Sequence, residues 1–405
     1  MSKKRTGKAL LTAVVAVGLA GYSATGGEWP RFMGPQGNGL SAETGFRKNW
    51  NEQAPRQVWR RDLSDKGYAG PAVAQGKVFI VDRDGKRDVV RAMDIATGKD
   101  VWTFAYDDPG RANYGFARAT PTVDGDRVYT LGRNGHLHCL NVKDGSLVWQ
   151  RNIVAEFKGR TPTWQLAMSP LVDGDRLIML PGGDKNVAAL DKRTGKTVWH
   201  GGNADRLGYA TPVPVTVGGV RQYLVFNGFA LTGIHTENGS VLWRQEWRTS
   251  HDVNAALPVP VGDGRVFITS GYGRGCALLD ISGASPRIVW ENKEVVAHFS
   301  SPILYKGHLY ANSDPTHLVC LDPKTGEAKW KQPGFGKGGL LIADGVIIAL
   351  DGNRGDAIMV RATPEKYEEL GRFRPLGGRS WTAPVLAGGM LIVRNQSAIA
   401  CFELR

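Results

Sequence analysis

The feature that most constrains this chain is a nine-residue segment that recurs along it. The copy Asp94–Trp102 begins with an aspartate, has Thr-Gly in its middle and ends with a tryptophan. Segments of the same length lie at Asn141–Trp149, Asp191–Trp199, His235–Trp243 and Asp322–Trp330, and Asp280–Trp290 is the same unit with two more residues. A proline precedes most copies, at Pro71, Pro121, Pro170, Pro212, Pro258, Pro302 and Pro384. The chain is therefore built from repeats of about 45 residues.

Each repeat predicts several short strands joined by turns. Apolar runs such as Lys77–Val81 and Arg127–Leu131 are typical of strands that are buried on both faces. The repeat aspartate favours a tight turn, because its carboxylate accepts a backbone N–H two residues on and the glycine allows a positive φ. The turn aspartates are Asp94, Asp191, Asp280 and Asp322.

The tryptophan after each turn is expected to begin the last strand and to pack between neighbouring repeats. A buried Trp removes roughly 150–250 Å² from water, so one ring per repeat supplies a large share of the packing. Seven of the 12 Trp residues occupy this position, namely Trp59, Trp102, Trp149, Trp199, Trp243, Trp290 and Trp330.

Four strands per period of this length predict an all-β fold, an eight-bladed β-propeller of four-stranded blades. The seventh repeat, near Leu340, is degenerate, and we expect Ala362 and Leu370 at its Asp and Trp positions. The eighth repeat stops after three strands, whereas Gln57–Arg60 is a final strand with no blade before it. We expect this N-terminal strand to close the last blade, because closure removes open sheet edges.

The N-terminus has the pattern of an export signal. Basic residues up to Lys8 precede the twelve apolar residues Ala9–Ala20, a run too short to span a bilayer. We predict a signal peptide over residues 1–26, a leader over 27–56 and the propeller over 57–405. Position 22 is Tyr, where a lipidated Cys would be required. We expect an exported monomer, periplasmic or extracellular, with no lipid anchor and no transmembrane span.

The four cysteines are expected to be free thiols in the core. Cys139, Cys320 and Cys401 share one repeat position, and Cys276 lies two residues before that position in its own repeat. The first three belong to blades two, six and eight, which are too far apart for the roughly 7 Å Cα separation of a disulfide. They should behave as small buried hydrophobic residues.

The repeat over Trp59–Arg405 resembles the pyrroloquinoline-quinone-type propeller repeat, and Trp29–Gly39 resembles the leader of exported bacterial quinone-binding-like repeat proteins. That superfamily includes eight-bladed quinoprotein dehydrogenases, which bind the quinone and Ca²⁺ over the central funnel. It also includes non-enzymatic propellers such as the lipoprotein of the outer-membrane barrel-assembly machinery. The resemblance therefore implies a fold and leaves the chemistry open.

Two departures from the dehydrogenases favour a protein without catalysis. The cysteines are isolated, so the adjacent Cys pair of the alcohol-oxidising members is missing, as is a Cys-x-x-Cys-His haem site. Ca²⁺ needs six to eight oxygen ligands, and the pore loops offer chiefly Asp252 and Asn254. We predict no catalytic residue, no metal and no cofactor. The alternative is a quinoprotein dehydrogenase with pyrroloquinoline quinone and Ca²⁺.

A binding site is expected where the loops that enter the blades meet around the pore. Aromatic and basic residues alternate in these loops, at Tyr68, Arg118, Trp164, Tyr209, Arg248, His251, Asn254, His298, Phe299 and Trp381. Two interpretations stay open. The residues form a hydrophobic plug with solvated arginines, or they bind an anionic or aromatic ligand, a glycan or an acidic peptide.

The function that we predict is an exported, non-enzymatic propeller that serves as a binding or assembly scaffold at the cell envelope. Its expected partner is an envelope protein or a polymeric ligand. The net charge of +13 would suit nucleic acid, but export argues against that partner.

Overall fold

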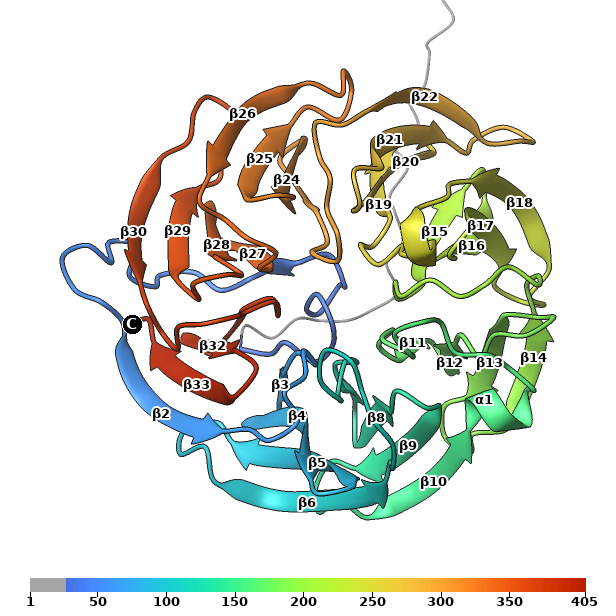
Figure 1. Ribbon diagram of the computed structural model, residues 1–405, viewed down its shortest axis with the longest axis horizontal. Helices are drawn as coiled ribbons and strands as arrows, with labels where there is room; N and C mark the ends of the chain where they lie inside the picture. The colour runs from blue at the N-terminus through green and yellow to red at the C-terminus, as the bar shows by residue number, and fades with distance from the viewer. Residues whose placement is uncertain (1–26) are drawn as a thin grey trace, which may run out of the picture.

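The computed structural model describes residues 27–405, which form a ring of eight antiparallel sheets around a central pore (Figure 1). The predicted all-β, eight-bladed propeller is confirmed. The predicted signal peptide, residues 1–26, lies outside the described residues. Within the described part of the chain, no helix has the length and apolar character needed to cross a membrane.

Blades one to four follow one another along the chain. Their strands are β3 (Ala72–Ala74), β4 (Lys77–Asp84), β5 (Arg87–Asp94) and β6 (Asp100–Asp107); β7 (Thr122–Asp124), β8 (Arg127–Leu131), β9 (His136–Asn141) and β10 (Leu147–Asn152); β11 (Leu171–Asp173), β12 (Arg176–Met179), β13 (Val187–Asp191) and β14 (Thr197–Gly201); and β15 (Val213–Val217), β16 (Val220–Phe226), β17 (Ala230–His235) and β18 (Val241–Glu246). Two short helices, α1 (Ile153–Glu156) and η1 (Ser250–Asp252), lie in loops.

Blades five to eight complete the ring. Their strands are β19 (Val259–Gly262), β20 (Arg265–Ser270), β21 (Gly275–Asp280) and β22 (Arg287–Asn292); β23 (Ile303–Tyr305), β24 (His308–Ser313), β25 (His317–Leu321) and β26 (Ala328–Pro333); β27 (Leu340–Ala343), β28 (Val346–Leu350), β29 (Ala357–Arg361) and β30 (Glu369–Phe373); and β31 (Val385–Ala387), β32 (Met390–Arg394) and β33 (Ala398–Glu403), joined by β2 (Arg56–Asp62).

The innermost strand of each regular blade begins directly after its proline. β3 starts after Pro71, for example, and β23 starts after Pro302. Proline has no N–H to donate and is suited to the first position of an edge strand. Blade seven lacks this proline, and its inner strand gains a parallel partner, β1 (Leu40–Ser41). The Ile342 N–H donates to Gly39 O at 3.0 Å.

The N-terminal strand closes the eighth blade, as the sequence predicts. β2 pairs antiparallel with β33, and Trp59 lies opposite Cys401. Beside this closure Arg394 Nη2 lies 3.0 Å from Asp65 Oδ1, and both side chains are 0% exposed. The two ends of the propeller therefore share one sheet, in which β2 covers the outer edge of β33 and completes the four-stranded blade.

The repeat turn and its tryptophan form the contact between neighbouring blades. The predicted bond to the N–H two residues on is present at Asp191, Asp280 and Asp322. Asp94 Oδ1 instead accepts the Thr97 N–H, three residues on, at 2.9 Å. The Trp59 ring lies on Gly98 of the next blade, where a Cβ atom would come within 2.6 Å of Cδ2. Trp59 Nε1 donates to Ile95 O of that blade at 2.7 Å. Equivalent bonds to the next blade come from Trp102, Trp149, Trp199, Trp290 and Trp330.

The degenerate seventh blade differs from the prediction by one residue at each repeat position. Gly371 pairs with Met359 beside a register shift, as each repeat Trp does in its own blade. Arg361 lies two residues beyond Met359 and so holds the Asp position. The prediction of Ala362 and Leu370 was wrong, because this blade has the longer form of the turn, as blade five does, and neither marker residue is present to set the register.

Trp50 from the leader covers the position where blade seven lacks its tryptophan. A Cβ atom on Gly371 would lie 2.8 Å from Trp50 Cβ. The Trp50 ring is 2% exposed and packs edge-on against Phe373, with ring centroids 5.1 Å apart. Phe373 in turn contacts Phe402 of blade eight at 5.1 Å. The leader therefore supplies the aromatic ring that the degenerate repeat does not encode.

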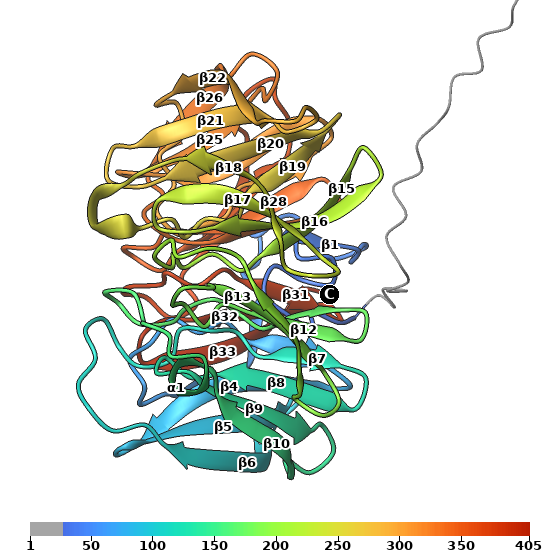
Figure 2. The same ribbon diagram turned by 90° about the vertical axis from the view of Figure 1, so that its right-hand side faces the viewer.

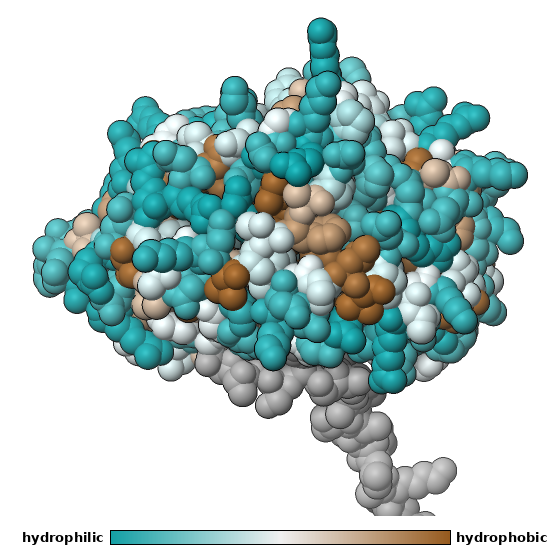
Figure 3. Space-filling model, turned by 90° about the horizontal axis from the view of Figure 1, so that it is seen from below, coloured by the Kyte–Doolittle hydropathy of each residue, from teal (hydrophilic) through white to brown (hydrophobic). Residues whose placement is uncertain are grey.

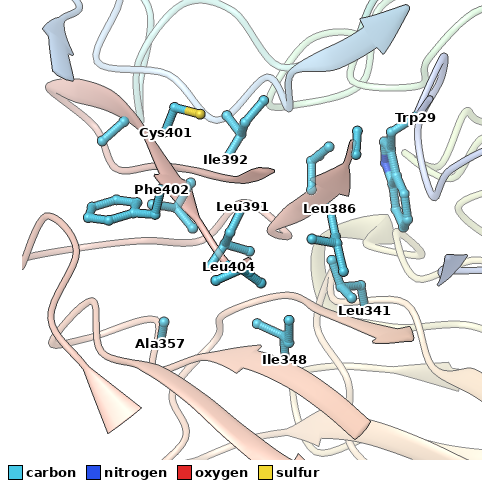
Figure 4. Packing of buried hydrophobic residues seen from close by; sticks show 14 of the residues in the cluster. Trp29, Leu341, Ile348, Ala357, Leu386, Leu391, Ile392, Cys401, Phe402 and Leu404 are labelled. Carbon is cyan, nitrogen blue, oxygen red and sulfur yellow. The ribbon is translucent and has the colours of Figure 1, made fainter. Parts of the chain in front are cut away.

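The apolar core runs through the interfaces between blades. Figure 4 shows the interface of blades seven and eight, where Leu341 lies beside Leu386. The four cysteines lie in this kind of environment. All are buried and free, as the sequence predicts, and Cys139, Cys320 and Cys401 each sit opposite a repeat Trp.

Candidate functional site

The leader crosses the bottom of the central pore. Trp29 forms a bridge with Val73 of blade one, in which each N–H donates to the other residue's oxygen at 2.8 Å. Pro30 O accepts the Val123 N–H of blade two at 2.8 Å, and β1 then joins blade seven. Figure 1 shows this dark-blue segment across the centre of the ring, and Figure 2 places β1 at one face of the disc. The pore is therefore a funnel with a floor.

A cavity of about 370 Å³ lies above this floor. Trp29, Phe32 and Met33 of the leader form its lower surface. Its middle wall comes from the residues at the entry of each inner strand, and one small residue per blade lines it: Gly70, Thr120, Ala167, Thr211, Ala255, Ser301, Gly339 and Ala383. Ala167 and Ala255 lie three residues before Pro170 and Pro258, the position that Tyr68, Phe299 and Trp381 hold in other blades, so small residues line the cavity at two levels.

Aromatic rings form an almost continuous chain around the mouth of the funnel. Tyr68 stacks on Trp381 with ring centroids 5.1 Å apart and planes inclined by 22°. The chain then continues through contacts of 4.7–6.2 Å between successive rings of Trp381, Phe299, His298, Tyr272, His251, Trp164 and Tyr209. These rings come from six of the eight blades and the loops that enter them. Rings packed in stacked, tilted and edge-on contacts in this way hold one another in place.

Arg118 lies at blade two, in the part of the circle without an aromatic ring. Its guanidinium donates to Asn113 O at 2.5 Å and to Gln165 Oε1 at 3.2 Å. No carboxylate of residues 27–405 pairs with it. Burial, and then the neighbouring charge of Arg133, lower the pKa of Arg118 to about 10. The wall therefore holds a partly desolvated cation whose present partners are neutral.

A buried ionic network fixes the loop that carries Arg118. Asp108 is 0% exposed and accepts the Arg133 Nε–H at 2.5 Å. Arg83 lies 3.7 Å from the same carboxylate and stacks over the Phe116 ring at 3.6 Å. A buried charge pair with additional hydrogen bonds holds its geometry tightly. The network therefore sets the position of the loop at residues 107–119 under the mouth.

A second cation, Lys337, enters the wall at blade seven. Its Nζ lies 2.8 Å from His298 Nδ1 and 3.5 Å from Asp314 Oδ2. Burial, and then the charge of Lys337, lower the pKa of His298 to about 4. The imidazole is therefore neutral at pH 7, and its Nδ1 accepts a hydrogen bond from the ammonium. Among the described residues, the wall holds these two cations and no carboxylate.

Two polar groups of the wall have no hydrogen-bond partner within residues 27–405. They are Trp381 Nε1 and Ser300 Oγ, and Ser300 is only 8% exposed. A buried donor without an acceptor costs about 1–3 kcal/mol. Both atoms are themselves buried, so they lie behind the cavity surface and are not exposed on it.

The structure brings most of the predicted site residues into one wall, namely Tyr68, Arg118, Trp164, Tyr209, His298, Phe299 and Trp381. His251 lies at the edge, with its ring 5.8 Å from that of Trp164. Arg248 is exposed, and its Nε donates to Glu246 at 2.8 Å. Asn254 is fully buried, and its side chain donates to Asn227 O at 2.7 Å, so it bonds to the main chain inside the protein and does not line the cavity. Binding by any of these residues stays a prediction.

The sequence argument missed several lining residues, namely Trp29, Phe32, Met33, Tyr114, Tyr272 and Lys337. The leader has no repeat position, so nothing in the period placed it in the pore. Lys337 belongs to the blade without the proline from which the other positions were counted. The concentration of apolar side chains over Trp29–Met33 was the one available signal.

The outer wall of the ring is a different kind of surface. Figure 3 shows its hydrophobic residues as separate patches in a hydrophilic surround. Aliphatic residues that are 37–49% exposed precede the repeat Trp on five outer strands, at Val101, Leu147, Val148, Val198, Val241, Leu242, Ile288 and Val289. They are spread over five blades, whereas the funnel gathers its apolar residues in one cavity.

The sequence repeat, the ring of eight blades and the central funnel together define an eight-bladed propeller with the quinoprotein-type repeat. The sequence profile of the family described as outer membrane protein assembly factor BamB matches residues 41–167 and 86–332. The chain belongs to this family, and the resemblance inferred from the repeat is confirmed.

Individual relatives agree with this membership. BamB of Salmonella typhimurium is 24% identical over 356 residues, which cover 74% of this chain and 87% of the relative. BamB of Escherichia coli is 24% identical over 333 residues, or 68% and 80% of the two chains.

Solved structures share the fold. The crystal structure of BamB from Moraxella catarrhalis has a TM-score of 0.60 at 15% identity and covers 86% of this chain and 97% of its own. Quinohemoprotein alcohol dehydrogenase from Comamonas testosteroni has a TM-score of 0.68 at 14% identity, with 93% and 80% covered. At these identities the likeness concerns the fold alone.

The funnel residues do not fit a quinone held by Ca²⁺. That ion needs six to eight oxygen ligands, and the described wall holds no carboxylate or amide side chain. Of the two loop residues expected to offer oxygens, Asn254 is buried and Asp252 pairs with Arg206 at 3.1 Å. No cluster of three His, Cys, Asp or Glu side chains in residues 27–405 is arranged to hold a metal ion.

Proposed function

We propose that this chain is an exported, non-enzymatic propeller that acts as a binding or assembly scaffold at the cell envelope, through the loops around its pore. The partner is an envelope protein or a polymeric ligand, and the propeller works as a monomer, without a lipid anchor and without nucleic acid. Its place is the periplasm or the extracellular face. Relatives named as outer membrane protein assembly factors support a partner in that assembly.

The aromatic funnel is the observation that carries this proposal. Fold stability does not require rings such as Trp164 and Trp381 to remain partly exposed around an open cavity. Partly exposed aromatic residues on a rigid ring of strands are the usual anchors of a protein interface. A floor made by the leader also means that a partner approaches from the mouth alone.

Retention of a partner from envelope extract tests the proposal. The chain and its Trp164→Ala and Trp381→Ala variants are immobilised and compared, with Val198→Ala on the outer wall as the matched control. We expect both mouth variants to lose at least about tenfold of the retained partner, the usual cost of an interface anchor, and the control to retain it. Equal retention by all three variants would place the working surface elsewhere.

The alternative, a quinoprotein dehydrogenase, rests on the shared fold. Reconstitution with pyrroloquinoline quinone and Ca²⁺, followed by dye-linked oxidation of alcohols and aldoses, separates the two functions. We expect no turnover above a quinone-only blank, because the wall offers no carboxylate ligands for the ion. Turnover above the blank would favour the quinoprotein dehydrogenase over the non-enzymatic scaffold.

A further inference from the structure

The funnel is shaped for a side chain rather than for a threaded polymer. The leader residues Trp29, Phe32 and Met33 close its lower end. A chain cannot pass through, so a polymeric partner inserts one group and continues along the mouth. The cavity of about 370 Å³ lies near the lower limit of sites for drug-sized ligands, roughly 300–1,000 Å³. It therefore accommodates one large side chain with its adjacent main chain.

The wall favours an aromatic group over a sugar. A sugar carries hydroxyl groups around the rim of its ring and needs a matching set of polar side chains, because an unpaired buried hydroxyl is costly. The described wall contains no Asp, Glu, Asn or Gln. It contains instead a chain of ring contacts in which Tyr68, Trp381 and Phe299 are neighbours. A planar apolar ring gains stacking contacts here without losing hydrogen bonds.

The charge of the wall calls for an anion beside that ring. Arg118 has neutral partners, and no carboxylate among the described wall residues balances it. Guanidinium groups bind carboxylates through paired, charge-assisted hydrogen bonds. At blade six, Ser300 Oγ and, from blade eight, Trp381 Nε1 lack partners within residues 27–405. Both atoms are buried, so the contact with the anion falls to Arg118.

We infer that the funnel receives an aromatic side chain of an acidic peptide segment, and that Arg118 binds a carboxylate on the same residue or on the one beside it. This inference rests on the proposed scaffold function and names the chemistry of its partner. The carboxylate comes from a neighbouring Asp or Glu or from a chain terminus, and the two sources share one chemistry at Arg118.

Fluorine NMR with defined probes tests the inference on the intact chain. The acidic probe is a capped pentapeptide with 4-fluorophenylalanine between two glutamates. Its matched partner has two glutamines, and a third probe, N-acetyl-4-fluorophenylalanine, carries a terminal carboxylate alone. We expect one or both carboxylate probes to bind at least about tenfold more tightly than the glutamine peptide, the worth of one charge-assisted contact. Tighter binding of the glutamate peptide identifies a neighbouring acidic side chain as the source of the carboxylate, and tighter binding of N-acetyl-4-fluorophenylalanine identifies a chain terminus.

Three variants locate the binding. Ala255→Phe fills the cavity from a part-exposed wall position and should weaken every probe at least about tenfold, whereas Arg118→Gln should remove only the preference for carboxylate. Ala167→Phe repeats the filling test from another blade if the first variant melts early. Arg193→Gln, an exposed arginine that pairs with Asp175 outside the cavity wall, is the control and should change nothing.

Three results would overturn the inference: no binding of any probe at millimolar concentration, equal affinity for acidic and glutamine peptides, or affinity unchanged by both filling variants. The scaffold function is judged separately by retention from envelope extract. If Trp381→Ala loses the envelope partner while no probe binds, the scaffold function stands and the aromatic-acidic ligand is rejected. If probes bind and no variant loses the partner, the funnel has a ligand that is unrelated to assembly.

Discussion

Two sets of aromatic residues in this propeller have opposite environments. The repeat tryptophans sit between blades, and Trp59, for example, lies on Gly98 and donates its Nε1–H to Ile95 O. The mouth aromatics sit at the end of the pore. Trp381 stacks on Tyr68 and under the Arg379 guanidinium at 4.6 Å, but its Nε1 has no partner in residues 27–405.

The difference separates rings that hold the fold together from rings that the fold presents. A repeat ring such as Trp59 or Trp102 packs on the next blade and donates its Nε1–H to a carbonyl there, so its loss leaves a cavity and an unpaired carbonyl. A mouth ring also contacts a neighbouring blade, as Trp381 does through Tyr68, but it lines the open cavity. Trp50 is an intermediate case, because it is 2% exposed between blades seven and eight and yet its Nε1 is unpaired.

The largest effect should come from removing the N-terminal segment that supplies the pore floor, Trp50 and the repeat residue Trp59. Deletion through Arg61 removes Trp29 from the pore floor, Trp50 from its groove, and β2 with Trp59 from the last blade. We expect aggregation or a much lower melting temperature, since β33 becomes an open edge. Deletion through Gly26 leaves every described contact and serves as the control. Equal melting temperatures for the two truncations would show that the blades close in some other way.

The next largest loss of stability should come from replacing a single repeat tryptophan. Trp102→Ala leaves a cavity between blades one and two and removes the bond from Nε1 to Val142 O at 2.9 Å. Truncation of a buried Trp costs about 3–5 kcal/mol of unfolding free energy. Urea unfolding measures it, with the exposed Val101→Ala next to it as the control. A loss under about 1 kcal/mol would contradict the assigned role of the repeat Trp.

Trp50→Ala tests whether the leader replaces the missing repeat residue. We expect a loss of about 3 kcal/mol, at the lower end of the range for a buried Trp, because no hydrogen bond of Nε1 is lost with the ring. The measurement is again urea unfolding. If Trp50→Ala proves as harmless as a change at the exposed Gln53 nearby, the groove between blades seven and eight is stabilised without the leader.

A pH effect should arise in the buried network under the mouth. Burial, and then the neighbouring Asp108, raise the pKa of Asp88 to about 6, against the attraction of Arg83. The folded chain therefore keeps a proton that the unfolded chain loses above about pH 4, so this group's contribution to stability falls as pH rises from 4 to 6. Two pKa units correspond to at most about 3 kcal/mol.

Comparison of Asp88→Asn with the parent chain at pH 4.5 and pH 7 measures this contribution. The variant should lose the part of the pH slope that belongs to Asp88. Asp62→Asn, at a carboxylate that is 84% exposed, should keep the parent slope. A variant at Asp88 with the parent slope would mean that the carboxylate is ionised throughout this range.

The smallest effect on stability should come from Trp381→Ala. Its ring is partly exposed and its Nε1 is unpaired, so we expect a loss under about 1 kcal/mol by urea unfolding, within the range of surface substitutions. A loss comparable to that of Trp102→Ala would favour the other interpretation of the mouth, a packed plug, and would erase the contrast between the two sets of rings.

The sequence by itself determined the features that repeat. Local spacing predicts the period, the turn aspartates, the Trp between neighbouring blades and the free cysteines. It does so because each blade packs against the next with the same residue types at the same positions. It also determined the closure, since Gln57–Arg60 and the short eighth repeat complement each other. Most of the mouth could be predicted too, as positions counted from the blade-opening prolines.

Tertiary structure alone decided what has no period. The leader could be assigned no place by spacing, and it proved to be the floor of the funnel, a fifth strand on blade seven and the source of Trp50. In blade seven the repeat positions could not be assigned from the sequence, because the marker residues are missing. The pairing of Gly371 with Met359 assigns them. Asn254 was expected at the mouth and is held inside by main-chain carbonyls. The leader contacts with blade seven, such as that of Trp50 with Gly371, join residues hundreds of positions apart, and only the closed ring brings them together.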